Sequence, residues 1–435
     1  MDPATLAGLI LLLGILVGIV FSLPIAIVIG AASFVAAIPL LGLEQAVLVT
    51  AQRMFTGINS FPLLAIPLFV LAGVIMNNGG IAARLVDAAK VATGRMPASL
   101  AQTNIVANAM FGAVSGAAVA AAAAVGNVMH GRMVQEGYDR RFAAAVNVAA
   151  APSGMLIPPS NTFIVYSLVS STSIAALFMA GLFPGLLWAF ACMVVTYLYA
   201  RKQPGKLRSA ERIGFVDGLK VIGRAVPSLL MIIIVVGGIL TGYFTATESA
   251  AIAVVYCLVL SAVYRSIKVR ELPGILLDAG RTTAIVMLLV AVSTALSFVM
   301  SFARIPDIIS DAVLGFTDSS VVILIIMMVV LLVVGTFMDP TPAILIFVPI
   351  FLPIVTEFGI DPVHFGAMVV MNLSVGVITP PVGNVLFVGA RLARLRIEPV
   401  IAKLWPFLVA IILTLFLVVF VPQISTWLPT VMGLM

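Results

Sequence analysis

Long apolar runs alternate with short polar segments along the whole chain. The apolar runs cover about residues 4–41, 61–78, 97–130, 142–200, 218–264, 282–302, 320–355, 363–390 and 404–430. A helix that crosses a bilayer needs about 20 consecutive apolar residues, and several of these runs are long enough for two passes. The pattern therefore predicts an all-α polytopic membrane protein.

The polar segments indicate how the chain is organised. Two amphipathic stretches, 79–96 and 264–281, are predicted to be helices along the cytoplasmic interface. The markedly polar connector 201–217 divides the chain into two halves and is predicted to be cytoplasmic. The N-terminal segment lacks the basic start of a cleavable signal peptide, so we expect its first helix to be retained and the N-terminus to lie outside, in the periplasm.

The composition excludes a soluble globular protein. Hydrophobic residues make up 62% of the 435 positions and charged residues only 9%, against roughly a quarter charged in soluble domains. The net charge of +6 arises from basic loop residues, which is typical of cytoplasmic loops rather than of nucleic-acid binding. Cys192 and Cys257 each lie inside an apolar run, so we expect both to pack in the core and to form neither a disulfide nor a metal site.

Five residues recur at a constant offset of 222 positions, the difference between 137 and 359. The matched residues are Gly137, Asp139, Gly154, Pro158 and Pro159 in the first half and Gly359, Asp361, Gly376, Pro380 and Pro381 in the second. The loop at 131–141 carries three arginines, whereas the loop at 356–364 has no lysine or arginine, so only the first is predicted to face the cytoplasm. This predicts an inverted structural repeat of about 1–217 and 218–435, an architecture of many secondary transporters.

Each half contains apolar runs interrupted by small or helix-breaking residues, followed by a proline pair. We expect two re-entrant helical hairpins at about 97–130 and 320–355 and two broken helices at about 142–169 and 363–390, with a C-terminal helix beyond. Proline lacks an amide donor and frees backbone carbonyls, which are tolerated in a membrane only inside protein or along a cavity. Kinks between packed helices are the alternative for a single site, but the duplication favours ion-binding breaks.

Polar side chains gather at these breaks. Hydroxyl and amide groups there can act as hard oxygen ligands, or as caps of the broken helix ends: Ser115, Ser160, Asn161, Thr162, Thr341, Thr379 and Asn384. A carboxylate inside a membrane is costly and points to function by default. For Asp339 we favour cation coordination or coupling over a structural hydrogen bond. For Glu248 we favour a structural role, either as a helix cap or as a bridge between scaffold elements.

The remaining candidates indicate neither metal chemistry nor ATP hydrolysis. His130 and His364 have no partner at metal-ligand spacing and are interpreted as interfacial polar residues. Three tryptophans near the ends of apolar runs are predicted to anchor their helices at the interface: Trp188, Trp405 and Trp427. The nearest match to a phosphate-binding loop, 126–133, has Arg132 and Met133 in place of the required lysine and hydroxyl, so no nucleotide cofactor is expected.

Several motifs together resemble the large membrane subunit of tripartite ATP-independent periplasmic (TRAP) transporters, the DctM or SiaM-like family. They span nearly the whole chain in order: GAVSG at 112–116, GYD at 137–139, LIPPS at 156–160, LFMAG at 177–181 with Pro184 and Gly185, TATESA at 245–250, MDPT at 338–341, GIDPVHFG at 359–366 and TPPVG at 379–383. The combination is far more specific than any one motif. One departure is that Ala117 and Ala118 stand where family members often have further hydroxyl residues, which bears on the substrate class.

The resemblance implies an elevator-type secondary transporter in a bacterial or archaeal cytoplasmic membrane, driven by a sodium gradient. It also implies two partners, a small four-helix membrane subunit and a periplasmic protein that delivers a substrate, commonly an organic acid. The implied sodium ligands are Ser115, Gly154 and Pro158 at one site, and Gly335, Asp339, Gly376 and Thr379 at the other. The implied substrate contacts are Ser115, Ser160, Asn161 and Thr341.

Two other functions remain open at this point. A stand-alone sodium–dicarboxylate carrier with a similar inverted repeat would need no partner. An intramembrane enzyme would need a base, a nucleophile or a metal triad at membrane depth, and neither histidine has suitable partners in the sequence.

Overall fold

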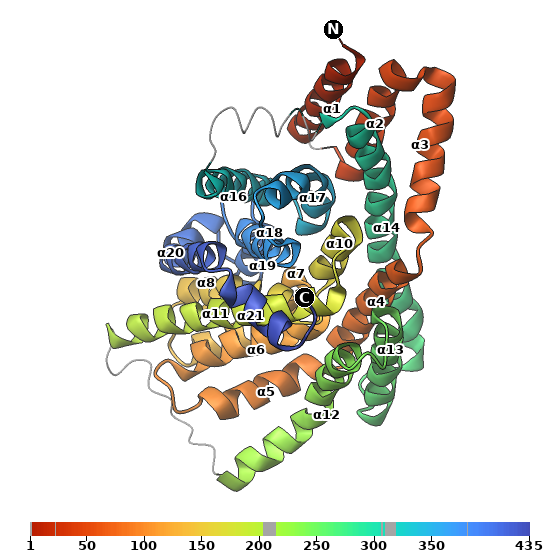
Figure 1. Cartoon of the computed structure of the whole chain (residues 1–435). Coiled ribbons are helices and arrows are strands. Elements are labelled where there is room, and N and C mark those ends of the chain that lie inside the picture. Colours follow the sequence, from red (N-terminus) through yellow and green to blue (C-terminus); the bar gives the residue numbers. More distant parts are fainter. Residues whose placement is uncertain (1, 22, 203–214, 306–307, 309–318, 381) are drawn as a thin grey trace.

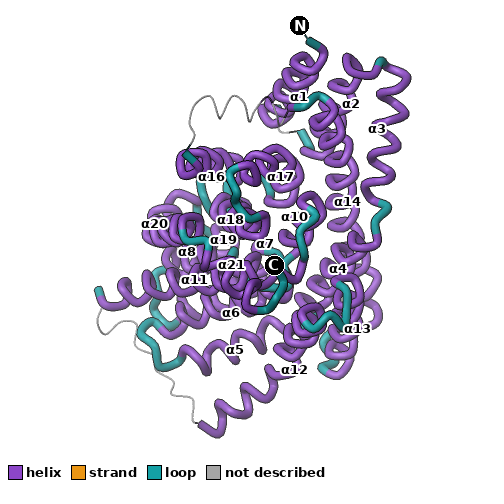
Figure 2. Tube along the Cα trace, in the orientation of Figure 1, coloured by secondary structure: helices purple, strands orange, loops and turns teal. Residues whose placement is uncertain are grey.

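The computed structural model describes all residues except 1, 22, 203–214, 306–307, 309–318 and 381. Within this part of the chain the regular structure is entirely helical (Figure 2). Eight of the described helices are long and apolar enough to cross a membrane, and a ninth span results if the bent pair Arg140–Leu156 and Asn161–Ser170 is one crossing. The all-α polytopic membrane architecture is confirmed. Most of the connector 201–217 lies outside the described residues.

Figure 1 shows an outer group of helices along the top, right and lower sides of the molecule. It consists of α1 (Pro3–Val20), α2 (Ile25–Leu41), α3 (Leu43–Ile58), α4 (Ala65–Asn78), α5 (Ile81–Thr93), α12 (Phe215–Leu240), α13 (Ala246–Val263) and α14 (Leu272–Phe302), with short 3₁₀ turns at Phe61–Leu64 and Val269–Glu271. Helix α14 contacts α2, α3 and α4, while α13 contacts α4 and α12. These contacts make the outer group one continuous layer.

The other helices form a more compact inner bundle (Figure 1). They are α6 (Ser99–Ser115), α7 (Ala118–Gln135), α8 (Arg140–Ala150), α9 (Ser153–Leu156), α10 (Asn161–Ser170), α11 (Ile174–Arg201), α16 (Ser320–Phe337), α17 (Pro340–Glu357), α18 (Pro362–Gly376), α19 (Asn384–Ala393), α20 (Ile397–Phe420) and α21 (Gln423–Val431). The bundle meets the outer layer where α5 contacts α6 and where α14 contacts α17.

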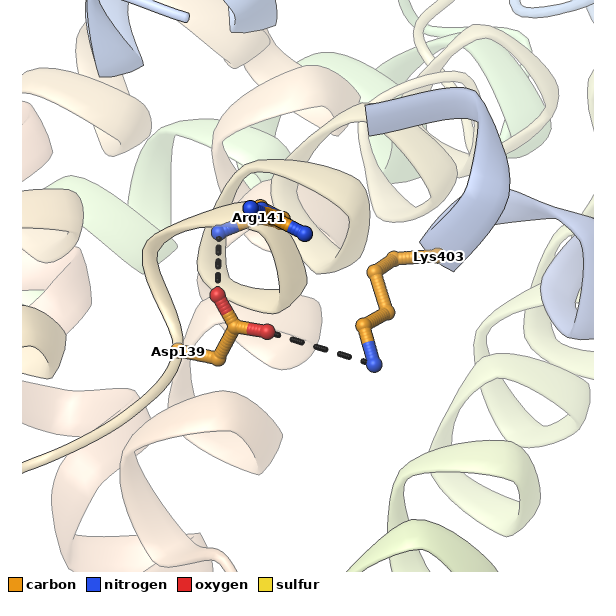
Figure 3. Close-up of polar contacts among 3 residues, drawn as sticks. All are labelled: Asp139, Arg141 and Lys403. Atoms are coloured by element: carbon orange, nitrogen blue, oxygen red, sulfur yellow. Dashed lines mark hydrogen bonds and ion pairs between the residues drawn. The ribbon is translucent and has the colours of Figure 1, made fainter. Parts of the chain in front are cut away.

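Helices α8 and α18 begin 222 residues apart, and both begin with an aspartate cap. Asp139 Oδ1 accepts a hydrogen bond of 3.0 Å from the amide of Arg141, and Asp361 Oδ1 accepts one of 2.7 Å from the amide of Val363. Such caps satisfy amides that have no partner within the helix. Figure 3 shows that the other carboxylate oxygen of Asp139 faces Lys403 of α20, with Oδ2 3.9 Å from Nζ.

Several smaller predictions are confirmed. The helix predicted in the amphipathic stretch 79–96 is the separate helix α5, while its place at the cytoplasmic interface stays a prediction. Glu248 caps α13 structurally, because it accepts a 2.8 Å hydrogen bond from the Thr245 amide while the Thr245 hydroxyl accepts one from the Glu248 amide. Cys192 and Cys257 are buried free thiols.

Three predictions are wrong. The stretch 264–281 forms no separate interfacial helix, because residues from Leu272 onward belong to the 31-residue α14. Trp188 is not an interfacial anchor, since it is fully buried and donates a 2.8 Å hydrogen bond to the Ala149 carbonyl. His364 is likewise buried, with Nδ1 2.7 Å from the hydroxyl of Ser425 in α21. In both side chains tertiary packing, and not position along an apolar run, decides exposure.

Candidate functional site

The first helical pair, α6 and α7, turns at Gly116. This glycine has φ +62°, in the left-handed region that favours glycine, and its amide donates a 2.7 Å hydrogen bond to the Gly112 carbonyl. A Cβ atom at Gly116 would lie 3.1 Å from both the backbone nitrogen and the side-chain nitrogen of Asn161. The turn between α6 and α7, which we call the first tip, therefore lies directly against the start of α10.

The helix opposite the first tip is broken between α8 and α10. The segments Arg140–Leu156 and Asn161–Ser170 differ in direction by 44°. Proline at 158 and 159 supplies no amide to the carbonyls of Gly154 and Met155, which an uninterrupted helix would pair with these positions. Gly154 also packs on Gly112 so closely that a Cβ atom on either residue would overlap the backbone of the other. The break is thus fixed against the first tip.

Two buried hydroxyls turn toward one of these carbonyls. Ser160 Oγ donates to the Met155 carbonyl, Thr162 Oγ1 lies 3.3 Å from the same oxygen, and the two hydroxyls are 2.7 Å apart. Ser160 and Thr162 therefore cap the break, the alternative role considered above. The nearby Ser115 is also buried, but its hydroxyl has only a 3.4 Å contact with the Ala117 carbonyl.

A second tip lies between α16 and α17 and packs on the break between α18 and α19. Gly335 and Gly376 approach so closely that a Cβ atom on Gly376 would overlap the Gly335 backbone. The Gly383 amide donates a 3.2 Å hydrogen bond to the Thr336 carbonyl, which ties the broken segment to the tip. At this break the Gly376 carbonyl accepts from the Thr379 amide at 3.0 Å, because position 380 is proline.

The polar side chains of the second tip differ in exposure and engagement. Asp339 is exposed and caps α17, with Oδ1 accepting a 3.2 Å hydrogen bond from the Thr341 amide. Thr379 is half-buried and donates a 2.7 Å hydrogen bond to the Val375 carbonyl. The capping position of α7, which is the counterpart of Asp339, is held by Ala117. The two tips therefore place a helix cap at matching positions but differ by one carboxylate, and their turns differ as well, because Gly116 is left-handed whereas its counterpart Met338 is extended.

The two tips and breaks belong to one packed unit. Helix α10 of the first break contacts α17 of the second tip, and α19 of the second break contacts α7 of the first tip. Near the centre, the Ser374 hydroxyl of α18 lies 3.9 Å from the Met155 sulfur of α9. Because of these contacts, Ser160 and Asn161 at the start of α10 belong to the same packed unit as Thr341 in the first turn of α17.

Sequence reasoning missed a buried amide cluster that holds the first tip in place. Asn108 Nδ2 donates to Asn104 Oδ1 at 2.8 Å and to Asn147 Oδ1 at 3.0 Å, and Asn147 Nδ2 donates to the Ala122 carbonyl at 2.8 Å. The cluster joins α6, α7 and α8. In the other half Asn372 of α18 donates a 3.0 Å bond to the Met328 carbonyl of α16. The available signal was the spacing of Asn104 and Asn108, which places both on one helix face inside an apolar run.

Comparison with known proteins agrees with this architecture. The chain is 48% identical over 408 residues to the uncharacterized protein YgiK of Salmonella typhimurium, a match that covers 94% of this chain and 93% of that protein. It is 37% identical over 385 residues to the C4-dicarboxylate TRAP transporter large permease protein DctM of Pseudomonas aeruginosa, covering 88% and 90% of the two chains. The crystal structure of the Alcanivorax borkumensis YdaH transporter shares the fold, with a TM-score of 0.65 at 15% identity over 100% of both chains.

A family model also matches nearly the whole chain. Residues 12–424 match the family described as tripartite ATP-independent periplasmic transporter, DctM component. This confirms the resemblance seen in the motifs, and it removes the intramembrane enzyme from consideration because the family is one of transport proteins. The chain belongs to the DctM component family of TRAP transporters.

Proposed function

We propose that this chain is the large transmembrane subunit of a sodium-coupled secondary transporter that imports a small organic acid anion. The observation that carries the proposal is the pair of tips packed on two broken helices, with Gly112 against Gly154 and Gly335 against Gly376. The family description, which names a tripartite and periplasmic system, supports two further components. These are a small four-helix membrane subunit and a periplasmic substrate-binding protein.

Each break supplies oxygen atoms suited to sodium. The first sodium site would use Ser115 with backbone around Gly154 and Pro158, where proline leaves carbonyls without helical amides. The second site would use Gly335, Asp339, Gly376 and Thr379. Asp339 is the one carboxylate in this proposed set, so the second site would pair a full negative charge with the ion. Sodium bound there would neutralise that charge.

The organic anion would bind where α10 and α17 begin. The amides at the start of a helix carry partial positive charge and favour anions. Ser160 and Asn161 lie at the start of α10, Thr341 lies in the first turn of α17, and Ser115 lies on the neighbouring first tip. The side-chain amide of Asn161 and the hydroxyls of Thr341 and Ser115 would donate hydrogen bonds to the carboxylate, while Ser160, whose hydroxyl donates to the Met155 carbonyl, would hold the start of α10 in place. The name of the Pseudomonas aeruginosa relative, a C4-dicarboxylate permease, favours this class of substrate.

Movement would take the form of an elevator. The inner bundle, which holds both tips and breaks, would slide as a rigid body against the outer layer that includes α3, α4 and α14. The proposed units are inverted repeats of residues 1–217 and 218–435. The 222-residue offset supports the duplication, because it separates the starts of α7 and α17 as well as those of α8 and α18. In this arrangement the N-terminus is periplasmic and the connector 201–217 is cytoplasmic.

Reconstitution tests the need for partners. The chain is placed in liposomes alone, with the small subunit, and with both the small subunit and the binding protein, and uptake of labelled C4-dicarboxylates and sugar acids is measured. We expect uptake only in the complete system. Equal uptake by the chain alone would instead support the stand-alone carrier.

A further inference from the structure

A polar recess of about 470 Å³ lies within the outer layer, between α5, α12 and α13. It is lined by Arg84, Asp87, Val221, Arg224, Pro227 and Tyr264. None of these residues belongs to the tips or breaks described above. The recess therefore needs an explanation that is separate from ion and substrate binding.

The recess carries uncompensated positive charge. Among the described residues no carboxylate lies within 4.0 Å of a nitrogen of Arg84 or Arg224, whereas Asp87 forms an ion pair with Arg132 of α7 at 3.6 Å. The one acidic side chain of the recess is thus engaged with a third arginine. Two guanidinium groups on different helices remain available for an anion.

Tyr264 orients the Arg84 guanidinium group and also carries a hydroxyl group that can donate a hydrogen bond. The Arg84 guanidinium carbon lies 3.3 Å from the centroid of the Tyr264 ring, a cation–π contact that holds the side chain over the ring. The Tyr264 hydroxyl is buried and has no hydrogen-bond partner among the described residues. A buried donor without a partner is costly, and an anion with several acceptor oxygens would satisfy it.

We propose that this recess binds a phosphate group, supplied by the headgroup of an anionic phospholipid. Guanidinium groups recognise phosphate through short, charge-assisted hydrogen bonds, and basic recesses between membrane helices bind anionic headgroups. The surroundings fit a lipid better than free phosphate, because exposed apolar side chains lie beside Arg224 in α12 and beside Tyr264 at the end of α13. These are Ile222 and Val226 beside Arg224, and Val263 beside Tyr264. Acyl chains would cover them.

Native mass spectrometry of the purified full chain in detergent tests this site. Wild type and the double variant Arg84→Gln/Arg224→Gln are titrated with phosphatidylglycerol and, separately, with inorganic phosphate. We expect the double variant to bind phosphatidylglycerol at least about tenfold more weakly. Arg95→Gln, which removes an exposed arginine just beyond α5, is expected to bind as wild type does.

The outcomes separate the sources of the phosphate group. Arginine-dependent binding of the lipid supports the site with a lipid ligand, and arginine-dependent binding of inorganic phosphate alone supports it with a soluble ligand. A double variant that binds phosphatidylglycerol as tightly as wild type and Arg95→Gln overturns the proposal. Arg84→Lys/Arg224→Lys keeps both charges if the glutamine variant does not fold, and it is expected to retain most of the binding. If wild type binds neither phosphatidylglycerol nor inorganic phosphate saturably, the proposal is overturned whether or not the glutamine variant folds.

Discussion

Gly112 of α6 and Gly154 of α9 lie so close that neither position has room for a side chain. A similar contact joins Gly335 of α16 and Gly376 of α18, where a Cβ atom on Gly376 would overlap the Gly335 backbone and one on Gly335 would lie 3.2 Å from the Gly376 Cα. Each contact presses the end of a helix that leads into a tip against a broken helix. Backbone carbonyls from two helices are thereby brought together at each break, which is the arrangement that a cation site built from peptide oxygens requires.

Gly154→Ala should separate the first tip from its break. The new methyl group would overlap the Gly112 backbone, and such overpacking costs about 1–3 kcal/mol of folding stability. We expect a lower unfolding temperature in detergent and loss of uptake in the reconstituted system. Gly131→Ala in α7 is the matched control, because nothing lies within 4 Å of a Cβ atom at that position. Equal unfolding temperatures for the two variants would contradict the close packing described here.

Asp339→Asn should weaken sodium dependence without unfolding the tip. Asparagine caps a helix about as well as aspartate, so the bond to the Thr341 amide is expected to survive while the charge is lost. We expect the sodium concentration for half-maximal uptake to rise about tenfold. Asp361→Asn changes an equivalent cap at the start of α18 and serves as the control. A normal sodium titration for Asp339→Asn would remove this residue from the proposed site.

Thr379→Ala should have a smaller effect of the same kind. The substitution removes one hydroxyl and its 2.7 Å bond to the Val375 carbonyl, but leaves every backbone oxygen of the second break in place. We expect about a threefold rise in the half-maximal sodium concentration, in line with the loss of one neutral polar interaction. Thr379→Ser keeps the hydroxyl and should titrate as wild type. If Thr379→Ser and Thr379→Ala have the same half-maximal sodium concentration, the Thr379 hydroxyl does not contribute to sodium binding.

The ion pair between Asp87 and Arg132 should report movement between the two groups of helices. It joins α5 of the outer layer to α7 of the inner bundle at 3.6 Å, and both side chains are about half exposed, at 53% and 50%. An exposed pair contributes only about 0.2–1 kcal/mol, so we expect Asp87→Asn and Arg132→Gln to change the uptake rate by no more than about fivefold and to leave the unfolding temperature unchanged.

A double-mutant cycle on the uptake rate, made of Asp87→Asn, Arg132→Gln and the variant that carries both changes, checks this pair. The charge-swapped variant Asp87→Arg/Arg132→Asp should recover most of the wild-type rate if the pair forms in one conformation and breaks in the other. Purely additive effects of the two single changes would show that the pair plays no part in the movement.

Much of the helical pattern could be predicted from local sequence. The proline pairs break helices because proline lacks an amide donor. Asp139 and Asp361, which recur at the 222-residue offset, mark helix starts because each caps amides in the first turn. Both effects act on the backbone close to the residue itself, so they can be predicted from a single sequence. The hairpins expected at about 97–130 and 320–355 accordingly coincide with the helical pairs α6–α7 and α16–α17.

Contacts between distant helices could not be predicted in the same way. The burial of Trp188 and the bond between His364 and Ser425 depend on which helices become neighbours. The bond between Asn147 and the Ala122 carbonyl joins α8 to α7 and has no local signature. The roles of Ser160 and Thr162 as caps of the Met155 carbonyl likewise became clear only from their geometry.

In the proposed mechanism the two breaks bind sodium and so couple its gradient to uptake of an organic anion. The most direct measurement is substrate accumulation in liposomes that contain the complete transporter, with an inward sodium gradient that is either maintained or collapsed by a sodium ionophore. Accumulation above the external concentration is expected only while the gradient lasts. Undiminished accumulation after its collapse would contradict the account.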